Sequence, residues 1–124
     1  MNNNRPINLE LSSLKFPPMA IASILHRLSG IVLFLALPLL LYVLQCSLAS
    51  EVSFYELTQW LKMPLLKAVF WGISAALVYH LFAGIRHMIM DLGFGEHLET
   101  GRRTAVLVIV LAVMTTIFLG FWIW

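Results

Sequence analysis

Three stretches without a charged residue constrain this chain more than any other feature of its sequence. They cover residues 28–50, 68–85 and 104–124. A helix needs about 20 mainly apolar residues to cross the hydrocarbon core of a bilayer. Lipid offers no hydrogen-bond partner to a bare peptide group, so helices are the expected spanning form. The sequence predicts an all-α membrane protein with three transmembrane helices.

The composition places the whole chain in the membrane class. Hydrophobic residues make up 60% and charged residues 11% of its 124 residues, whereas soluble domains carry about 25% charged residues. We expect one membrane domain over residues 1–124. Its helices are expected over about 19–49, 63–91 and 103–124. The segment at about 51–61 is mildly amphipathic, which fits either a helix along the membrane surface or a simple linker. Three spans enclose little space, so a partner is expected.

The basic residues predict how these helices are oriented. Only two flank the connection between the first and second helices, and they are Lys62 and Lys67. The other six lie by the start of the first helix or the second connection: Arg5, Lys15, Arg27, Arg86, Arg102 and Arg103. Loops rich in lysine and arginine stay in the cytoplasm, so the N-terminus is expected there. No nucleic-acid partner is expected, because these residues follow the topology rather than form one patch.

Two polar clusters interrupt the apolar segments and are expected to lie near each other. The first opens the first helix and contains Ser23, His26 and Arg27. The second closes the second helix and contains Tyr79, His80, Arg86, His87 and Asp91. Ionisable groups at membrane depth are costly and persist where they bind a ligand, move protons or pair with each other. The functional site is therefore expected in these clusters.

His80 belongs to a stripe of small residues on the second helix. Gly72, Ala76, His80 and Gly84 recur every four residues and share one face. Small residues let another helix or a flat ligand approach the backbone closely. An imidazole in their midst is suited to be an axial ligand of haem iron. The spacing also fits a helix-packing surface with one hydrogen-bonded histidine, and spacing alone leaves both interpretations open.

A haem ligated by His80 would need help from a second chain. His80 precedes Asp91 by about 16 Å of helix, and the other histidines lie nearer the boundary or in a connection. The second axial ligand is therefore expected from another subunit. Haem propionates would face the cationic end of the helices, with Arg27 as the strongest partner. Weaker candidates are His26, Arg86 and His87. Arg86 also fits a charge that only marks the helix end.

Ser23 and Arg27 form a second candidate site, for a quinone. They are four residues apart and share a helix face. A hydroxyl and a guanidinium at the edge of an apolar space are able to orient a quinone carbonyl while the tail stays in lipid. Two alternatives remain open. Ser23 could bond to its own helix backbone, and Arg27 could extend to phosphate headgroups.

Two ordered motifs stand out along the chain. The first combines Arg5-Pro6, Asn8-Leu9 and Phe16-Pro17 with the run AIASILHRLSG over residues 20–30. The second is the run YHLFAGIRHMIMD over residues 79–91. Both resemble motifs of the cytochrome b556 subunit of succinate dehydrogenase, in which the second is a histidine-to-aspartate signature. Chain length and the three spans match as well. The resemblance covers essentially the whole chain, and the bacterial form is the most similar.

This resemblance implies a membrane anchor of complex II, succinate:quinone oxidoreductase, in the bacterial inner membrane. In that family a flavoprotein subunit oxidises succinate and an iron–sulfur subunit passes electrons on. Two small anchors bind haem b and help to form the ubiquinone site. By the resemblance, His80 is the axial ligand, and a second three-helix anchor supplies the other. Ser23 and Arg27 match the quinone-site residues, and His26 and Arg27 match the region near the haem propionates. His87 is expected only in the haem environment.

Two other functions fit parts of the same pattern. A haem-free structural anchor of a related fumarate reductase would show no b-type absorption. A small transport or proton-path subunit would use His80, His87 and Asp91 as a relay, and would carry flux without soluble partners. The chain is expected to be a subunit of an enzyme, without a complete active site of its own.

Overall fold

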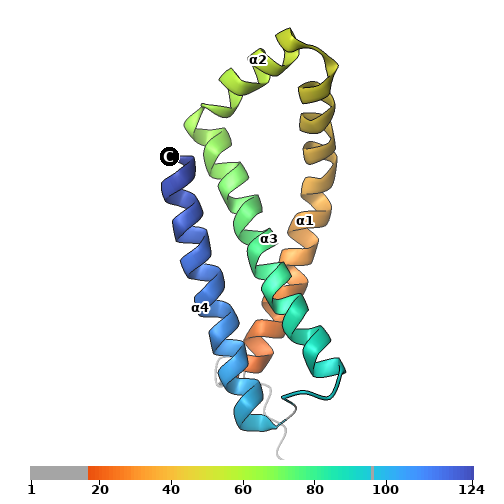
Figure 1. Ribbon diagram of the computed structural model, residues 1–124, viewed down its shortest axis with the longest axis vertical. Helices are drawn as coiled ribbons and strands as arrows, with labels where there is room; N and C mark the ends of the chain where they lie inside the picture. Colours follow the sequence, from red (N-terminus) through yellow and green to blue (C-terminus); the bar gives the residue numbers. More distant parts are fainter. Residues whose placement is uncertain (1–16, 96) are drawn as a thin grey trace, which may run out of the picture.

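The chain folds into four α-helices over the residues that the computed structural model describes, 17–95 and 97–124. They are α1 (Pro18–Ala49), α2 (Glu51–Leu61), α3 (Pro64–Asp91) and α4 (Leu98–Ile123). Three of them, α1, α3 and α4, are long and apolar enough to cross a membrane, which confirms the predicted all-helical architecture with three candidate spans (Figure 1). Arg5, Lys15 and Phe16, used above for topology and resemblance, lie outside the described residues.

The starts of the long helices follow from local chemistry. Both α1 and α3 begin with a proline at the first helical position, where its missing N–H has no intrahelical acceptor to lose. Helix α4 begins at Leu98, earlier than the expected residue 103. The expectation counted only the uncharged run. Glutamate and arginine are good helix formers, and Glu99 pairs with Arg103 at 2.6 Å along the exposed first turns.

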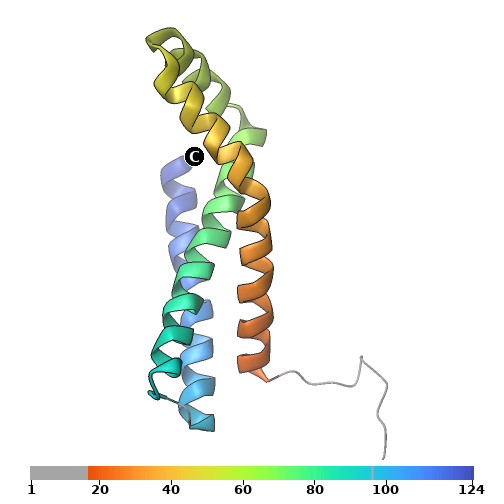
Figure 2. The ribbon, with the colours of Figure 1, turned by 90° about the vertical axis from the view of Figure 1, so that its right-hand side faces the viewer.

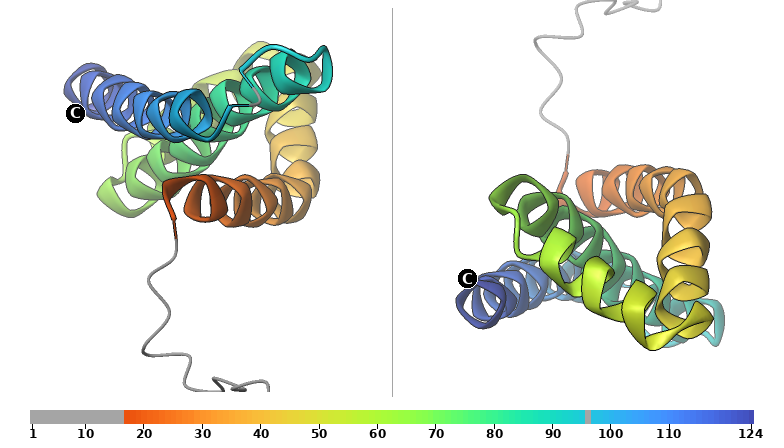
Figure 3. Two further views of the ribbon diagram at one scale, coloured as in Figure 1. Left: turned by 90° about the horizontal axis from the view of Figure 1, so that it is seen from below. Right: turned by 90° about the horizontal axis from the view of Figure 1, so that it is seen from above.

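Helix α1 is bent, and its second half turns away from α3. Figure 1 shows α1 crossing α3 toward one end of the molecule and separated from it at the other, and Figure 2 shows the change of direction within α1. Pro38 lies inside α1, and an internal proline removes one backbone hydrogen bond and bends a helix. The end-on views of Figure 3 show the same change of direction.

Helix α2 bridges the gap that this bend opens. It runs across the top of the molecule from α1 to α3 (Figure 1). The Ser50 hydroxyl caps it by accepting the Ser53 N–H at 3.1 Å, as N-cap serines do. The Ser53 hydroxyl donates to the Cys46 carbonyl at 2.8 Å and so fastens α2 to the end of α1. The first connection is therefore a helix rather than a simple linker.

A tight turn joins α3 to α4 at the opposite end. The Gly93 N–H donates to the Met90 carbonyl at 2.9 Å and the Phe94 N–H to the Ile89 carbonyl at 3.3 Å. This is the Schellman pattern, which needs a left-handed residue after the helix, and Gly93 has a φ of 84°. The turn brings the end of α3 next to the start of α4.

Small residues form the centre of the three-helix packing. The buried positions on α4 recur at helical spacing and face inward: Gly101, Ala105, Val108 and Ala112. Ala22 of α1 and Ala83 of α3 are each only 1% exposed. A Cβ on Gly101 would lie 2.6 Å from Met19 Sδ, so α1 and α4 approach closely here. Close approach through small side chains is how membrane helices associate.

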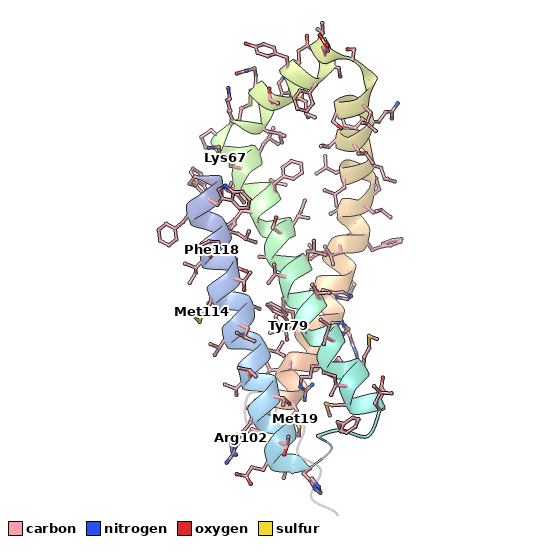
Figure 4. All side chains as sticks on the ribbon, in the orientation of Figure 1. Met19, Lys67, Tyr79, Arg102, Met114 and Phe118 are labelled. Carbon is pink, nitrogen blue, oxygen red and sulfur yellow. The ribbon has the colours of Figure 1, made fainter. Side chains whose placement is uncertain are left out.

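The outer surfaces of the helices are apolar, as a membrane protein requires. Large hydrophobic side chains are exposed along all three long helices, among them Phe34, Leu81 and Phe121. Figure 4 shows Met114 and Phe118 pointing away from the other helices. An apolar surface this extensive is unstable in water and suits lipid or a partner subunit.

Ala105 offers a direct test of this packing. The residue is completely buried, so Ala105→Leu should lower the free energy of unfolding by about 1–3 kcal/mol through overpacking. The measurement is thermal unfolding of the detergent-solubilised protein, followed by circular dichroism. Val106→Leu, at an exposed neighbouring position, is the control and should leave the transition unchanged. Equal stability of both variants would contradict the packing described here.

Candidate functional site

Three histidine rings gather where α1 packs against α3. His26 comes from α1, and His80 and His87 come from α3. The His26 and His80 rings are stacked, with centroids 4.2 Å apart. The His26 and His87 rings are tilted, with centroids 5.1 Å apart. The two polar clusters of the sequence therefore meet, as predicted.

The His80 ring is held by groups on α1. Its Nδ1 lies 3.1 Å from Ser29 Oγ and 3.2 Å from the His26 carbonyl oxygen. Gly30 backs the ring, because a Cβ on Gly30 would lie 3.1 Å from His80 Cε1. Any larger residue at position 30 would push against the imidazole. The contacts fix both the tilt and the position of the ring.

The His26 ring has an unused polar atom inside the protein. Its Nε2 is buried and has no hydrogen-bond partner among the described residues. A Cβ on Gly84 would lie 3.4 Å from this atom, so the small residue makes room for the ring. A buried polar atom without a partner is costly. His26 is therefore a side chain that gains from a bound group.

Tyr79 fixes α3 against α1 beside the histidines. Its hydroxyl donates to the Ala22 carbonyl at 2.9 Å, and Figure 4 shows Tyr79 where the two helices run together. The bond crosses from one long helix to the other, one residue from His80 in sequence. It therefore sets the height of His80 relative to α1.

Arg86 belongs to a different contact from the one expected. It is 7% exposed, and its Nε donates to Thr104 Oγ1 and its Nη2 to the Gly101 carbonyl, both at 3.1 Å. These bonds join α3 to α4. The sequence left two interpretations of Arg86 open, a weaker candidate partner of haem propionates and a charge that marks the helix end, and in the structure its guanidinium donates to α4. Proximity in sequence to His87 did not decide the direction of the side chain.

Arg86→Met tests this structural role. Loss of both interhelical bonds should lower the free energy of unfolding by about 1–2 kcal/mol, measured by thermal unfolding in detergent. Arg102→Met provides the matched control, because Arg102 lies exposed on α4 at the same end of the molecule (Figure 4). An Arg86 variant as stable as the Arg102 variant would remove the structural role.

Ser23 and Arg27 lie on α1, one turn apart. Ser23 is half-buried and Arg27 is exposed. Over the described residues neither side chain has a hydrogen-bond partner, whereas Ser29, Ser47 and Ser74 all bond to their own helix. The alternative in which Ser23 bonds to its own backbone is thus not seen. Both groups are available as donors to a ligand.

The small-residue stripe on α3 divides into two parts. Near the histidines Gly84 faces His26 of α1, whereas a Cβ on Gly72 would have no neighbour within 4 Å. The bend of α1 explains the difference, since the two helices separate toward the Gly72 end (Figure 1). The stripe is therefore an intrachain packing surface only at one end.

The residues present fit an axial ligand of haem iron. His80 has one ring nitrogen in hydrogen bonds to α1, and its Nε2 has none among the described residues. Haem iron takes a single imidazole nitrogen from each side. In the described part of the chain no three His, Cys, Asp or Glu residues gather into a metal site. A bare-metal centre built by this part of the chain is thus not indicated.

Comparison with known proteins agrees with the motifs. The family model of the succinate dehydrogenase/fumarate reductase transmembrane subunit matches residues 1–119. The succinate dehydrogenase cytochrome b556 subunit of Coxiella burnetii is 49% identical over the full length of both chains. That of Paracoccus denitrificans is 33% identical, over 92% of this chain and 91% of its own. The cytochrome b560 subunit of Reclinomonas americana is 34% identical, over 94% of this chain and 85% of its own.

These likenesses define the class of protein. The chain belongs to the family of succinate dehydrogenase/fumarate reductase transmembrane subunits. The resemblance to the cytochrome b556 subunit that the motifs predicted is confirmed. Together with the three helices able to span a bilayer, it makes this a multi-pass membrane protein.

Sequence reasoning missed two residues of the site, Ser29 and Gly30. A signal was present, because Ala22, Ser29 and Ala36 recur every seven residues and are the buried residues of α1. A seven-residue interval returns to the same helix face. That face, which carries Ser29 toward α3, could have been recognised as the packing surface of α1.

Proposed function

We propose that this chain is a cytochrome b membrane anchor of succinate:quinone oxidoreductase. It would hold haem b together with a partner subunit and form part of the ubiquinone-reduction site. Support comes from the family and from the names of the relatives, which are cytochrome b subunits of succinate dehydrogenase. The observation that carries the proposal is the His80 ring, fixed through Nδ1 and without a partner at Nε2 among the described residues.

The residues around His80 have separable roles in this proposal. His80 Nε2 would hold the haem iron together with a residue of the partner subunit. Haem b supplies reversible one-electron chemistry when bound. Arg27 is the donor for the propionates, and His26, whose Nε2 is buried beside Gly84, belongs to the haem environment. His87 borders the same space through its contact with His26. Arg86 acts indirectly by fastening α4 to α3.

Ser23 and Arg27 are the proposed quinone donors. Both are on the first turns of α1, and neither is tied up by another described residue. Hydrogen bonds and positive charge directed at a quinone oxygen favour the more negative, reduced forms before protonation. The isoprenoid tail would remain among the exposed apolar side chains. Arg27 therefore serves both the quinone and the propionates.

The proposed assembly has three further subunits. A second three-helix anchor would cover exposed apolar surface and supply the second ligand of the iron. An iron–sulfur subunit would deliver electrons and a flavoprotein subunit would oxidise succinate. The proposed location is the bacterial inner membrane, with the His97 end of the helices toward the cytoplasm, because most of the basic residues lie at that end.

Purification distinguishes this proposal from its rivals. The experiment is gentle solubilisation from membranes, identification of the co-purifying subunits and a reduced-minus-oxidised spectrum. Flavin and iron–sulfur subunits together with a b-type spectrum are the expected result. Co-purification without b-type absorption would indicate a haem-free structural anchor. Isolation without soluble subunits, with proton or solute flux in vesicles, would indicate a transport subunit.

A further inference from the structure

We infer that Ser29 is a positioning residue that, together with the His26 carbonyl, holds His80 in one tautomer and tunes its strength as an iron ligand. The inference rests on the proposed function, since it concerns the imidazole that is proposed to bind haem. It assigns a role to a side chain that carries no charge and would not itself touch the iron.

The argument starts from the three polar groups that meet at His80. Ser29 Oγ donates to the His26 carbonyl at 2.8 Å. His80 Nδ1 lies 3.1 Å from Ser29 Oγ and 3.2 Å from the same carbonyl oxygen. A carbonyl oxygen only accepts hydrogen bonds, and a serine hydroxyl has one hydrogen to donate. The hydroxyl hydrogen is therefore directed to the carbonyl.

This arrangement leaves one consistent assignment for the imidazole. If Nδ1 carries the hydrogen, it donates to both Ser29 Oγ and the His26 carbonyl. If Nδ1 were bare, its lone pair would face the carbonyl oxygen at 3.2 Å without a hydrogen between them. The Nδ1–H tautomer is thus selected, and in neutral imidazole the other nitrogen then carries the lone pair. That nitrogen is Nε2, the proposed iron ligand.

Burial strengthens the effect of the Ser29 hydroxyl on the His80 ring. Ser29 is 7% exposed, so water does not readily replace its hydroxyl. Gly30, the next residue, leaves the space that the ring occupies against α1, because a Cβ there would lie 3.1 Å from His80 Cε1. An acceptor on the second nitrogen of a ligand histidine orients the ring and raises its basicity, and loss of such a partner typically weakens metal binding about 10–100-fold.

The test replaces Ser29 in the complete complex purified from membranes. Ser29→Ala should release haem about tenfold faster than the wild type. Its haem should also have a more positive midpoint potential, because a less basic imidazole favours the ferrous state. Ser47→Ala is the matched control, because Ser47 also bonds to a carbonyl three residues earlier in α1, with no imidazole nearby. It should match the wild type, and Ser29→Thr, which keeps a hydroxyl, should restore most of the potential.

The outcomes separate this inference from the function on which it rests. A wild-type complex without b-type haem, or His80→Ala with unchanged haem, would overturn the proposed function. Another outcome is that His80→Ala alters the haem spectrum while Ser29→Ala matches Ser47→Ala in midpoint potential and haem release. That result would overturn the role of Ser29 and leave the proposed function standing. If the Ser29→Ala complex fails to assemble, an experimental structure of the wild-type complex tests the role of Ser29 instead. Ser29 Oγ within hydrogen-bond distance of Nδ1 of the iron-bound imidazole is expected, and a separation beyond 4 Å would overturn the inference.

Discussion

His80→Ala is expected to abolish the wild-type b-type spectrum of the purified complex. The substitution removes the only imidazole among the described residues whose ring is fixed through one nitrogen and open at the other. Loss of an axial ligand should weaken haem binding at least as much as loss of an outer hydrogen bond, which costs about 10–100-fold. The measurements are haem content per flavin and the reduced-minus-oxidised spectrum.

A double variant tests in addition whether the neighbouring His26 ring contributes to haem binding. It lies 4.2 Å from His80, centroid to centroid, and its Nε2 is buried without a partner in the described part of the chain. In the His26→Ala/His80→Ala complex neither imidazole remains, so binding of haem by this chain should be lost. His97→Ala, an exposed position at the start of α4, is the control and should keep the full spectrum. An unchanged spectrum in the double variant would exclude His26 and His80 as ligands of the haem iron.

Arg27→Leu is expected to reduce quinone reductase activity by about 100-fold, the scale seen when one donor to a developing negative charge is removed. The guanidinium is exposed and has no hydrogen-bond partner among the described residues, so its loss should not disturb the helix packing. Succinate oxidation with an artificial acceptor should continue at the wild-type rate, because that step is assigned to the soluble subunits. The two assays on one preparation separate electron delivery to quinone from the chemistry upstream.

Arg102→Leu is the matched control for this experiment. Arg102 is also exposed and lies at the same end of the molecule, on α4 (Figure 4), so it tests whether any loss of positive charge there suffices. It should retain normal activity. Haem content should be measured in both variants, since Arg27 is also a proposed propionate partner. Normal quinone reduction by Arg27→Leu would end the proposed quinone role of this residue.

The meeting of the two polar clusters was predictable from the sequence, whereas the direction of each side chain was not. The two clusters were expected to meet because one opens the first predicted span and the other closes the second, at the same end of the molecule. Arg86 was a weaker candidate partner of the propionates because the sequence did not give the direction of its side chain, and its guanidinium bonds to α4. Adjacent residues on a helix point about 100° apart, so a neighbour in sequence often belongs to a different contact.

The ends of the helices were likewise predictable from the sequence only in part. Pro18 and Pro64 can be recognised in the sequence as helix starts, because proline is favourable at the first helical position and unfavourable within a helix. The start of α4 at Leu98 was not readable from the uncharged run, since a helix continues into water wherever good helix formers follow one another. A bend of α1 at Pro38 follows from the missing backbone donor of proline, but its direction depends on what the helix packs against.

By itself, the sequence determined three apolar spans, the family and the residue types available for haem and quinone. Those properties depend on hydrophobic length and local order, which a single chain carries along its backbone. Only the tertiary structure decided that Ser29 and the His26 carbonyl hold His80, and that Arg86 fastens α4. These contacts join positions far apart in the chain, and they exist because small residues such as Ala22 and Ala83 let the helices approach closely enough for short polar groups to meet.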